Sequence, residues 1–451
     1  MRTVISLLFI ITFTFVSYGQ KKMTLQKAIN IALQRNITLQ KSMNNLKSLR
    51  SNVKAAYGNF LPSLSVNGNW NWQRTIQNEG GSYNFQGVTI PIPKRIAENR
   101  NYSASVNSSW SLFNGLSMFA NLSKNKNNYK SARLSLEREK QNIVFQTIGL
   151  YYTVINAQQL LKVKEKDLKW NKRNLETIIE RNKLGAVTLA DVYSQQVQEG
   201  NAELALIQAK NNVEIAKSNL LYFLGLNVLK NYKFTNALTT EEQKILKEKF
   251  TNDYNELSIL VRQALQHRID LESARLAIQS AKDAVTIAWA GNLPSLNGMF
   301  SYNLRGNEFS WTNLQKSRSY FAGLTLRIPI FSGFSVENRI ELAKVNVENA
   351  SVDLTNLQRQ ITQNIQKTYL DLQAGEKNLE VSRRNVKAAE ENRKIAEEKY
   401  TLGSGTLLDV LIANSNYTNA RTNRINNEFN YIVLSKQLKY YLGVLNYKQY
   451  E

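Results

Sequence analysis

The sequence has no cysteine, so disulfides, thiolate metal sites and the lipid-bearing cysteine of a bacterial lipoprotein are all excluded. It has 1 histidine and 5 methionines, so we expect no metal site, and nothing in the sequence indicates a cofactor. In an internal repeat described below, His267 aligns with Arg35, and a position that accepts either residue is typical of a surface site. No signature of an enzyme is present, so we expect no catalytic residues.

Proline and glycine are also scarce, with 5 and 20 residues in a chain of 451, which favours long uninterrupted helices. The one long apolar run, from Val4 to Val16, follows Arg2 and precedes the small residues Ser17 and Gly19. This pattern predicts a secretory signal peptide at 1–19. No later segment approaches the ~18 consecutive apolar residues of a membrane helix, so any membrane crossing must be made by strands.

The formal net charge is +23, and a secreted nucleic-acid binder is therefore one function to weigh. The lysines and arginines are interleaved with acidic residues, as in 137–140 and 164–167, which is typical of a solvated helical surface. We expect no nucleic-acid partner.

Two strands with one apolar face are predicted between Leu61 and Gly115. Polar residues alternate with apolar ones at a period of two, as in a strand whose faces meet different surroundings. The apolar positions are Leu64, Val66, Gly68, Trp70 and Trp72, then Tyr102, Ala104, Val106, Trp110 and Leu112.

The pattern recurs between Leu293 and Gly333, which makes four such strands per chain. Its apolar positions are Leu296, Gly298, Phe300, Tyr302 and Leu304, then Tyr320, Ala322, Leu324, Leu326, Ile328 and Ile330. Each strand is long enough to cross a bilayer at a tilt. Four strands cannot close a barrel, and open sheet edges are not tolerated in lipid, so the chain must then oligomerise. A soluble sandwich with one wet face fits the same alternation.

The two hairpins belong to a tandem duplication. Leu61-Pro62-Ser63-Leu64 matches Leu293-Pro294-Ser295-Leu296, and Leu184-Gly185 matches Leu402-Gly403. We expect a signal peptide at 1–19, a first repeat at 20–226 with a β-hairpin at 62–113, a connecting region at 227–253 that girdles the helices, a second repeat at 254–445 with a β-hairpin at 294–331, and a short tail at 446–451. The first hairpin is the longer one, which predicts a long outer loop at 74–100 and a shorter one at 305–319.

Each repeat is predicted to run helix, hairpin, long helix, turn, helix. In the first repeat, the helices span Leu25 to Phe60, 116–183 and Leu189 to Phe223; the second of these is about 100 Å long. Apolar residues seven apart predict coiled-coil seams rather than a compact bundle. They are Val154, Leu161, Leu168 and Leu175, then Leu372, Leu379 and Val386.

The turns after the long helices carry the same motif in both repeats. Thr188 with Asp191, and Thr406 with Asp409, are three apart at a helix start, which predicts two capping boxes. Gly185 and Gly403 are expected to end the preceding helices.

The signal peptide, the duplication, the Leu-Pro-Ser-Leu strands and the Leu-Gly-x-x-Thr-x-x-Asp-Val turns together resemble the TolC-like outer membrane factor family. The resemblance covers essentially all of the mature chain. It implies a mixed fold: a homotrimer with a twelve-stranded transmembrane β-barrel in outer membrane lipid, continuous with a periplasmic α-helical coiled-coil barrel that is gated at its inner tip.

The resemblance also implies a function and partners. The trimer would be the exit duct of a tripartite efflux pump or type I secretion system. It would dock to a periplasmic adaptor, and through it to an inner-membrane transporter of the RND or ABC type. The adaptor would contact Leu184, Gly185, Thr188, Asp191 and Val192, and Leu402, Gly403, Thr406, Asp409 and Val410. The alanine frequent after Asp-Val in the family is Ala413 in the second repeat, but Gln195 in the first.

One alternative remains beside this interpretation. A structural coiled-coil envelope protein would use the same helices without a transport role. The acidic residues Glu390, Glu391, Glu397 and Glu398 would suit a charged constriction, but they alternate with Arg393, Lys394 and Lys399. Such alternation favours solvated pairs on a helix surface.

Overall fold

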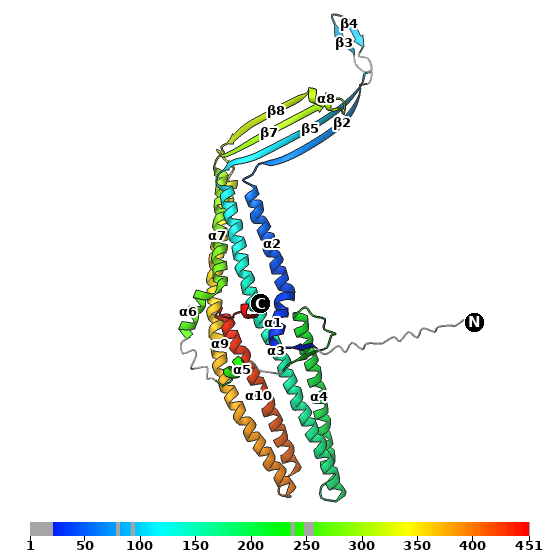
Figure 1. Cartoon of the computed structure of the whole chain (residues 1–451), viewed down its shortest axis with the longest axis vertical. Helices are drawn as coiled ribbons and strands as arrows, with labels where there is room; N and C mark the ends of the chain where they lie inside the picture. Colours follow the sequence, from blue (N-terminus) through cyan, green and yellow to red (C-terminus); the bar gives the residue numbers. More distant parts are fainter. Residues whose placement is uncertain (1–20, 78–81, 92–94, 236–239, 248–256, 451) are drawn as a thin grey trace, which may run out of the picture. The chain divides into compact units, whose positions relative to one another are not determined.

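The structure is a computed structural model that describes residues 21–77, 82–91, 95–235, 240–247 and 257–450. The predicted signal peptide at 1–19 lies outside these residues. The chain forms two compact units (Figure 1). The helical unit comprises Met1–Ser42, Leu136–Ile269 and Gln358–Glu451, and the sheet unit comprises Met43–Ser135 and Asp270–Leu357.

Two long helices contribute residues to both units. They are α3 (Ser117–Lys183) and α9 (Ser335–Thr401), each of 67 residues. In the helical unit they are followed by α4 (Leu189–Phe223) and α10 (Leu407–Tyr441), each of 35 residues. The predicted long helix at 116–183 and the predicted helix from Leu189 to Phe223 are confirmed, because no proline interrupts either and a glycine follows each long helix.

The seven-residue stripes lie on the packed faces of these helices. Val154 and Leu372 are almost completely buried in the helical unit, and Leu379 is 3% exposed. Polar contacts fix how the helices pair: Asn156 Nδ2 on α3 donates to Asn426 Oδ1 on α10 at 3.1 Å, and Asn427 Nδ2 donates to the Asn378 carbonyl at 3.3 Å. Narrow apolar seams of this kind are the coiled-coil packing that the sequence predicts.

The prediction of one helix from Leu25 to Phe60 is wrong. The chain forms α1 (Leu25–Arg35) and α2 (Ile37–Gly58), with Asn36 between them. Asn36 Oδ1 accepts hydrogen bonds from the Thr38 and Leu39 amides at 2.9 and 3.3 Å, and its Nδ2 donates to the Phe223 carbonyl at 3.0 Å. The buried Asn36 side chain therefore caps a new helix and satisfies a backbone carbonyl at the C-terminal end of α4. The second repeat is divided likewise, into α6 (Leu257–His267) and α7 (Ile269–Trp289).

The connecting region is partly described. Strand β6 (Tyr232–Phe234) pairs in parallel with β1 (Lys21–Met23), and α5 (Thr240–Ile245) follows. The Tyr151 hydroxyl on α3 donates to the Thr235 carbonyl at 2.8 Å, which ties this strand pair to the long helix. The rest of the predicted region, at 236–239 and 248–253, lies outside the described residues. Near the end of the chain, the short helix η3 (Lys448–Tyr450) follows the buried Tyr447.

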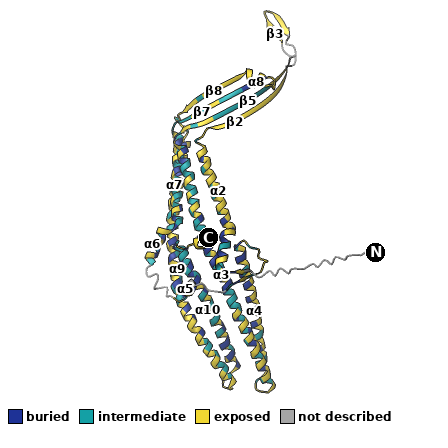
Figure 2. Cartoon of the chain, viewed as in Figure 1, coloured by how far each residue is buried: buried dark blue, intermediate teal, exposed yellow. Residues whose placement is uncertain are grey.

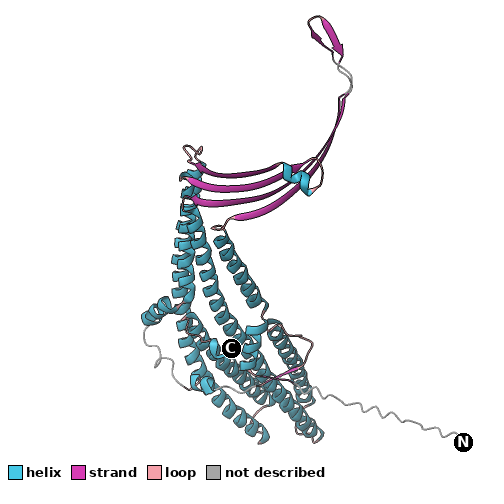
Figure 3. Ribbon diagram, turned by 45° about the horizontal axis from the view of Figure 1, so that its top comes forward, coloured by secondary structure: helices cyan, strands magenta, loops and turns pink. Residues whose placement is uncertain are grey.

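The sheet unit contains a four-stranded antiparallel sheet (Figure 3). Its strands are β2 (Ser63–Gln77), β5 (Arg95–Asn114), β7 (Ser295–Gly306) and β8 (Arg318–Arg327), in the order β2-β5-β7-β8. Both hairpins thus join one sheet, with β2 and β8 at its two edges.

The register places residues of one kind opposite each other across this sheet. On one face, Trp70 pairs with Tyr102 and their rings stack at 6.4 Å, while Tyr302 pairs with Tyr320 at 4.8 Å. On the other face, Asn67 pairs with Ser105. Figure 2 shows that most residues of the sheet are exposed. The sheet therefore presents one apolar and one polar surface.

The predicted loop at 74–100 is shorter than expected. The β2–β5 ladder continues through Arg74↔Glu98 and Ile76↔Ile96, and the Arg74 and Glu98 side chains form an ion pair at 3.6 Å. Between these strands, β3 (Ser82–Phe85) and β4 (Val88–Pro91) form a hairpin of their own. The predicted loop at 305–319 contains α8 (Trp311–Lys316), whose first turn is capped by Ser310 Oγ. The strand pairing thus lengthens both strands of the first hairpin into the segment that was predicted to be a loop.

A polar seam joins α3 to α7 within the sheet unit. Asn127 Nδ2 donates to the buried Asp283 carboxylate at 2.8 Å, and Ser280 Oγ donates to Asn128 Oδ1 at 2.6 Å. Buried polar contacts of this kind specify register more than they add stability.

Among the described residues, no helix combines the length and the apolar character needed to span a membrane.

Candidate functional site

The two turns at the far ends of the long helices have the predicted glycine geometry. Gly185 has φ +72° and Gly403 has φ +78°, in the left-handed region that favours glycine. After α3, the Ala186 amide donates to the Arg181 carbonyl at 2.9 Å, and the Gly185 amide donates to the Asn182 carbonyl at 2.9 Å. These paired bonds form a Schellman motif, so the expectation that the glycines end the helices is confirmed.

Both predicted capping boxes are present. The Asp191 amide donates to Thr188 Oγ1 at 3.2 Å, and the Thr188 amide donates back to Asp191 Oδ2 at 3.0 Å. The same two bonds join Thr406 and Asp409, at 3.2 and 3.0 Å. Each box satisfies amides at a helix start that have no partner within the helix.

Hydrogen bonding at the second tip also lowers the pKa of Asp409. Thr406 Oγ1 donates to Asp409 Oδ2 at 2.7 Å. This side-chain bond, followed by the one from the Thr406 amide, holds the pKa of the Asp409 carboxyl below its usual range. The carboxylate is therefore charged at neutral pH and stabilises the positive end of the α10 dipole.

The predicted docking residues divide by exposure. Leu184 and Leu402, at the outermost turns, are 83% and 82% exposed, which is unusual for large apolar side chains at matching positions of two repeats. Val410, by contrast, is 2% exposed. It packs inside the coil, so the predicted docking residues that remain exposed at the second tip are Leu402, Gly403, Thr406 and Asp409.

The position that differs between the repeats is internal at both tips. Gln195 is completely buried, and its Nε2 donates to the Asn171 carbonyl at 3.0 Å while its Oε1 accepts from Asn174 Nδ2 at 2.8 Å. Ala413 is 1% exposed. Gln195 therefore links α4 to α3 within the first tip and leaves the outer surface of that tip unchanged.

Contacts between the two helical hairpins were missed from the sequence. Trp170 Nε1 on α3 donates to Glu397 Oε1 on α9 at 2.9 Å, and Arg393 lies 3.8 Å from the same carboxylate. Nearer the tips, the Arg181 guanidinium lies 5.0 Å from the centre of the Tyr400 ring. The predicted pairing of Glu397 with Arg393 along α9 is thus present, and Glu397 in addition accepts a hydrogen bond from another helix, which the sequence did not indicate.

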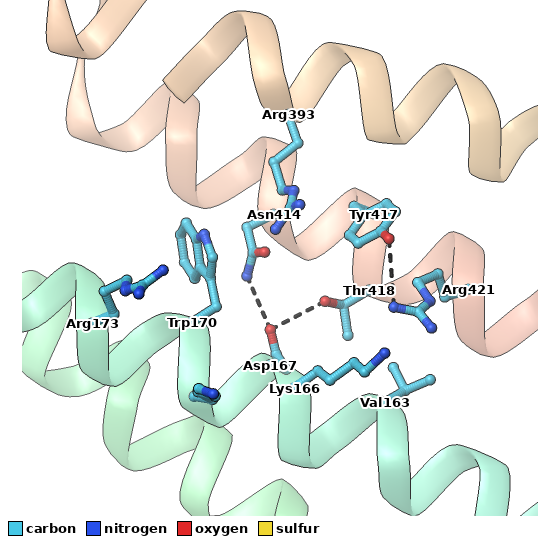
Figure 4. Close-up of a pocket in the computed structure, with 11 residues that line it drawn as sticks. Val163, Lys166, Asp167, Trp170, Arg173, Arg393, Asn414, Tyr417, Thr418 and Arg421 are labelled. Atoms are coloured by element: carbon cyan, nitrogen blue, oxygen red, sulfur yellow. Dashed lines mark hydrogen bonds between the residues drawn. The ribbon is translucent and has the colours of Figure 1, made fainter. Parts of the chain in front are cut away.

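Just beside these contacts is a small cavity of about 250 Å³ between α3, α9 and α10 (Figure 4). On its wall, the Asp167 carboxylate on α3 accepts hydrogen bonds from Asn414 Nδ2 at 3.0 Å and Thr418 Oγ1 at 3.1 Å on α10. Apolar residues seven apart on one helix are a usable sequence signal, but Asp167, Asn414 and Thr418 belong to no such repeat. Only the packing of α3 on α10 brings them together.

Other charged residues match their predicted roles. Lys394 Nζ pairs with Glu391 at 2.9 Å on the exposed surface of α9. His267 is exposed at the end of α6, where its Nδ1 lies 2.8 Å from the Gln263 carbonyl. The prediction that His267 occupies a surface site is confirmed.

Comparison with known proteins identifies the family. The family model described as "Outer membrane efflux protein" matches residues 28–226 and 260–444. The outer membrane protein TolC of Escherichia coli is 22% identical over 326 residues, which cover 69% of this chain and 64% of TolC. The match thus leaves more than a third of that relative unmatched.

Solved structures show the same fold. The Campylobacter jejuni CmeC outer membrane channel superposes with a TM-score of 0.77 at 19% identity, covering 93% of this chain and 85% of CmeC. The outer membrane protein VceC of Vibrio cholerae gives a TM-score of 0.75 at 19% identity, covering 93% of this chain and 96% of VceC.

These relatives confirm that the chain is not an enzyme and that its location is the outer membrane, with a long helical extension into the periplasm. The predicted resemblance is likewise confirmed. The chain belongs to the outer membrane efflux protein family.

Proposed function

We propose that this chain forms a homotrimeric channel, the outer membrane exit duct of a tripartite efflux pump or type I secretion system. Its helical tips dock to a periplasmic adaptor, and through the adaptor to an inner-membrane transporter of the RND or ABC type. Transport is then passive within the duct, because the chain supplies a conduit and its partners supply the energy.

The observation that carries this proposal is the open four-stranded sheet. Among the described residues, its edge strands β2 and β8 have a neighbour on one side only, and they run in opposite directions. In lipid, the free backbone groups of both edges need partners. If β8 of one copy pairs with β2 of the next, the antiparallel order continues, and three copies close a barrel of twelve strands. The serine and asparagine face then lines the pore.

A second observation supports a partner copy beside α4. Large apolar residues at spacings of three, four, seven or eight line one side of this helix and are at least half exposed: Tyr193, Val197, Leu204, Ile207, Ile215 and Tyr222. An exposed stripe with this period is the seam of a coiled coil that lacks its partner helix. A neighbouring copy in the helical tube supplies that helix.

The tips support adaptor docking. Leu184 and Leu402 offer two exposed apolar anchors, and each lies beside a rigid turn that is held by a glycine and a capping box. Preorganised apolar anchors with polar groups around them are typical of protein interfaces. Val410 is not part of this docking surface, because its side chain is buried and supports the tip from inside.

The barrel is tested by disulfide cross-linking, for which the absence of native cysteine is an advantage. Ser65→Cys on β2 is combined with a cysteine at Ser319, Phe321, Gly323 or Thr325 on β8 in turn. We expect one or two of these pairs to give covalent dimers and trimers in outer membranes. Ser105→Cys on the central strand β5, combined with the same β8 positions, is the matched control and gives no cross-link between copies. A conducting monomer without edge cross-links contradicts the proposal.

A further inference from the structure

A broad hollow lies on the apolar face of the sheet, where β5, β7 and β8 are adjacent. Its volume is about 740 Å³. It is lined by Pro62, Ser108, Trp110, Leu112, Gly298, Met299, Phe300, Ala322, Gly323 and Leu324. No charged side chain lines it, and Ser108 supplies its one side-chain hydroxyl.

The hollow arises from two neighbouring rows of the register. In one row Trp110, Gly298 and Leu324 lie side by side, and in the next row Ser108, Phe300 and Ala322 do so. Large and small side chains therefore alternate both across and along the sheet. A Cβ at Gly298 would lie 3.5 Å from Leu324 Cδ2 and 3.6 Å from Leu112 Cδ1, so the glycine is the floor between two apolar walls.

Trp110, which lies beside Gly298 and also lines the hollow, is held in place. Its Nε1 donates a hydrogen bond of 2.9 Å to the Phe60 carbonyl, just beyond the end of α2. The indole nitrogen is thus satisfied by protein, while Trp110 lines the hollow and remains 45% exposed. A tryptophan with a bonded nitrogen and a free apolar ring suits the boundary of a membrane.

We propose that this hollow binds an acyl chain of a phospholipid from the periplasmic leaflet of the outer membrane. The proposal rests on the proposed function, in which this sheet crosses the membrane with its apolar face toward lipid. The hollow lies at the end of the sheet nearest to Phe60 and Pro62, where the strands join the helices, so it opens into the periplasmic half of the bilayer.

The geometry favours an acyl chain over a protein segment. In the proposed trimer, neighbouring copies pair through β2 and β8, whereas the floor of the hollow belongs to the inner strand β7. The lining offers almost no hydrogen-bonding side chain, and the backbone of a bound peptide would lose its partners there. A flexible hydrocarbon loses none, and it fills an irregular apolar hollow that would otherwise remain unfilled.

The test uses Trp110 as the reporter. In the full-length protein the other five tryptophans, Trp70, Trp72, Trp170, Trp289 and Trp311, are replaced by phenylalanine. The trimer is reconstituted into phosphatidylcholine vesicles whose acyl chains carry bromine, which quenches indole fluorescence on contact. Gly298→Leu and, independently, Ala322→Leu fill the hollow. Gly68→Leu, on the same apolar face but with no atom within 4 Å of its Cβ, is the matched control.

We expect strong quenching of Trp110 in the parent and in Gly68→Leu, and loss of most of it in both hollow-filling variants. Equal quenching in all four proteins overturns the binding site, because Trp110 then meets only bulk lipid. Absence of quenching in every protein, with the trimer inserted, means that this face does not meet lipid. That last result overturns the proposed barrel together with the site.

Discussion

Trp170 on α3 donates a hydrogen bond of 2.9 Å to Glu397 on α9, a residue distant from it in the sequence. Less than one turn away on α3, Asp167 accepts hydrogen bonds from Asn414 and Thr418 of α10. These bonds tie the hairpin of α3 and α4 to the hairpin of α9 and α10. In the proposed duct, the two hairpins can part at the tips only if such contacts break.

Loss of the Asp167 carboxylate should therefore widen the channel. Asp167→Ala leaves Asn414 and Thr418 without their acceptor, at a cost of about 1–3 kcal/mol for groups that remain buried. Combined with Trp170→Phe, it should raise single-channel conductance in planar bilayers while trimer yield stays normal. Asp167→Asn, which keeps a carbonyl acceptor, is the control and should change conductance much less. Unchanged conductance in the double variant would show that these bonds do not restrict opening.

Replacing both tip glycines should separate docking from assembly. A β-branched residue at φ +72° and +78° is strained by about 1–2 kcal/mol, although no atom obstructs a Cβ at either position. Gly185→Val with Gly403→Val should give a normal trimer in the outer membrane but no cross-linking to the adaptor, and drug resistance or secretion should be lost.

Asparagine tolerates the left-handed region better than valine, so Gly185→Asn with Gly403→Asn is the matched control for that experiment. It should restore most of the cross-linking. If the valine variant keeps both docking and export, the tips are turns without a docking role.

The capping boxes should stabilise the tips locally. Thr406→Ala removes the acceptor of the Asp409 amide and should cost about 0.5–2 kcal/mol in the first turn of α10. Amide hydrogen exchange there should accelerate accordingly, with no change in the middle of α9. Thr406→Ser keeps the hydroxyl and should behave nearly as the parent. Equal exchange in the alanine and serine variants would mean that the observed bonds add no stability.

The lowered pKa of Asp409 predicts a change at acidic pH. Because the folded-state pKa lies below the unfolded value, the contribution of Asp409 to stability is fully present above the ordinary aspartate pKa of about 3.9 and is lost as pH falls through the folded-state pKa. Hydrogen exchange at the start of α10, corrected for its intrinsic pH dependence, should therefore accelerate below that range. Asp409→Asn cannot titrate and should show no such step; a step of equal size in this variant would assign the effect to another group.

The β3–β4 hairpin should lie outside the cell. Its turn contains Gln86 with φ +49° and Gly87 with φ +85°, and a Cβ at Gly87 would meet no atom within 4 Å. An epitope inserted between these residues should leave the trimer intact and label whole cells. The predicted outer loop also contains Gly80 and Gly81, which lie outside the described part of the chain. Labelling only after permeabilisation of the outer membrane would reverse the topology.

Features that depend on neighbours in sequence were predictable. The C-terminal end of α3 followed from Gly185, and the start of α4 followed from Thr188 with Asp191. Caps act through bonds between residues at most five positions apart. The two faces of each strand followed from the alternation of side chains in a pleated backbone. These features can therefore be predicted from the local sequence, without knowledge of the rest of the fold.

Features that depend on residues far apart in sequence required the tertiary structure. The helix break at Asn36 exists because its side chain reaches the Phe223 carbonyl, and the ladder of β2 continues past Arg74 because Glu98 and Ile96 lie opposite. Glu397 belongs to a contact between helices because Trp170 faces it across the fold. Periodicity identifies the packed side of a helix, but the position of one helix along another is set by the sum of many side-chain contacts. Those contacts exist only after the chain has folded.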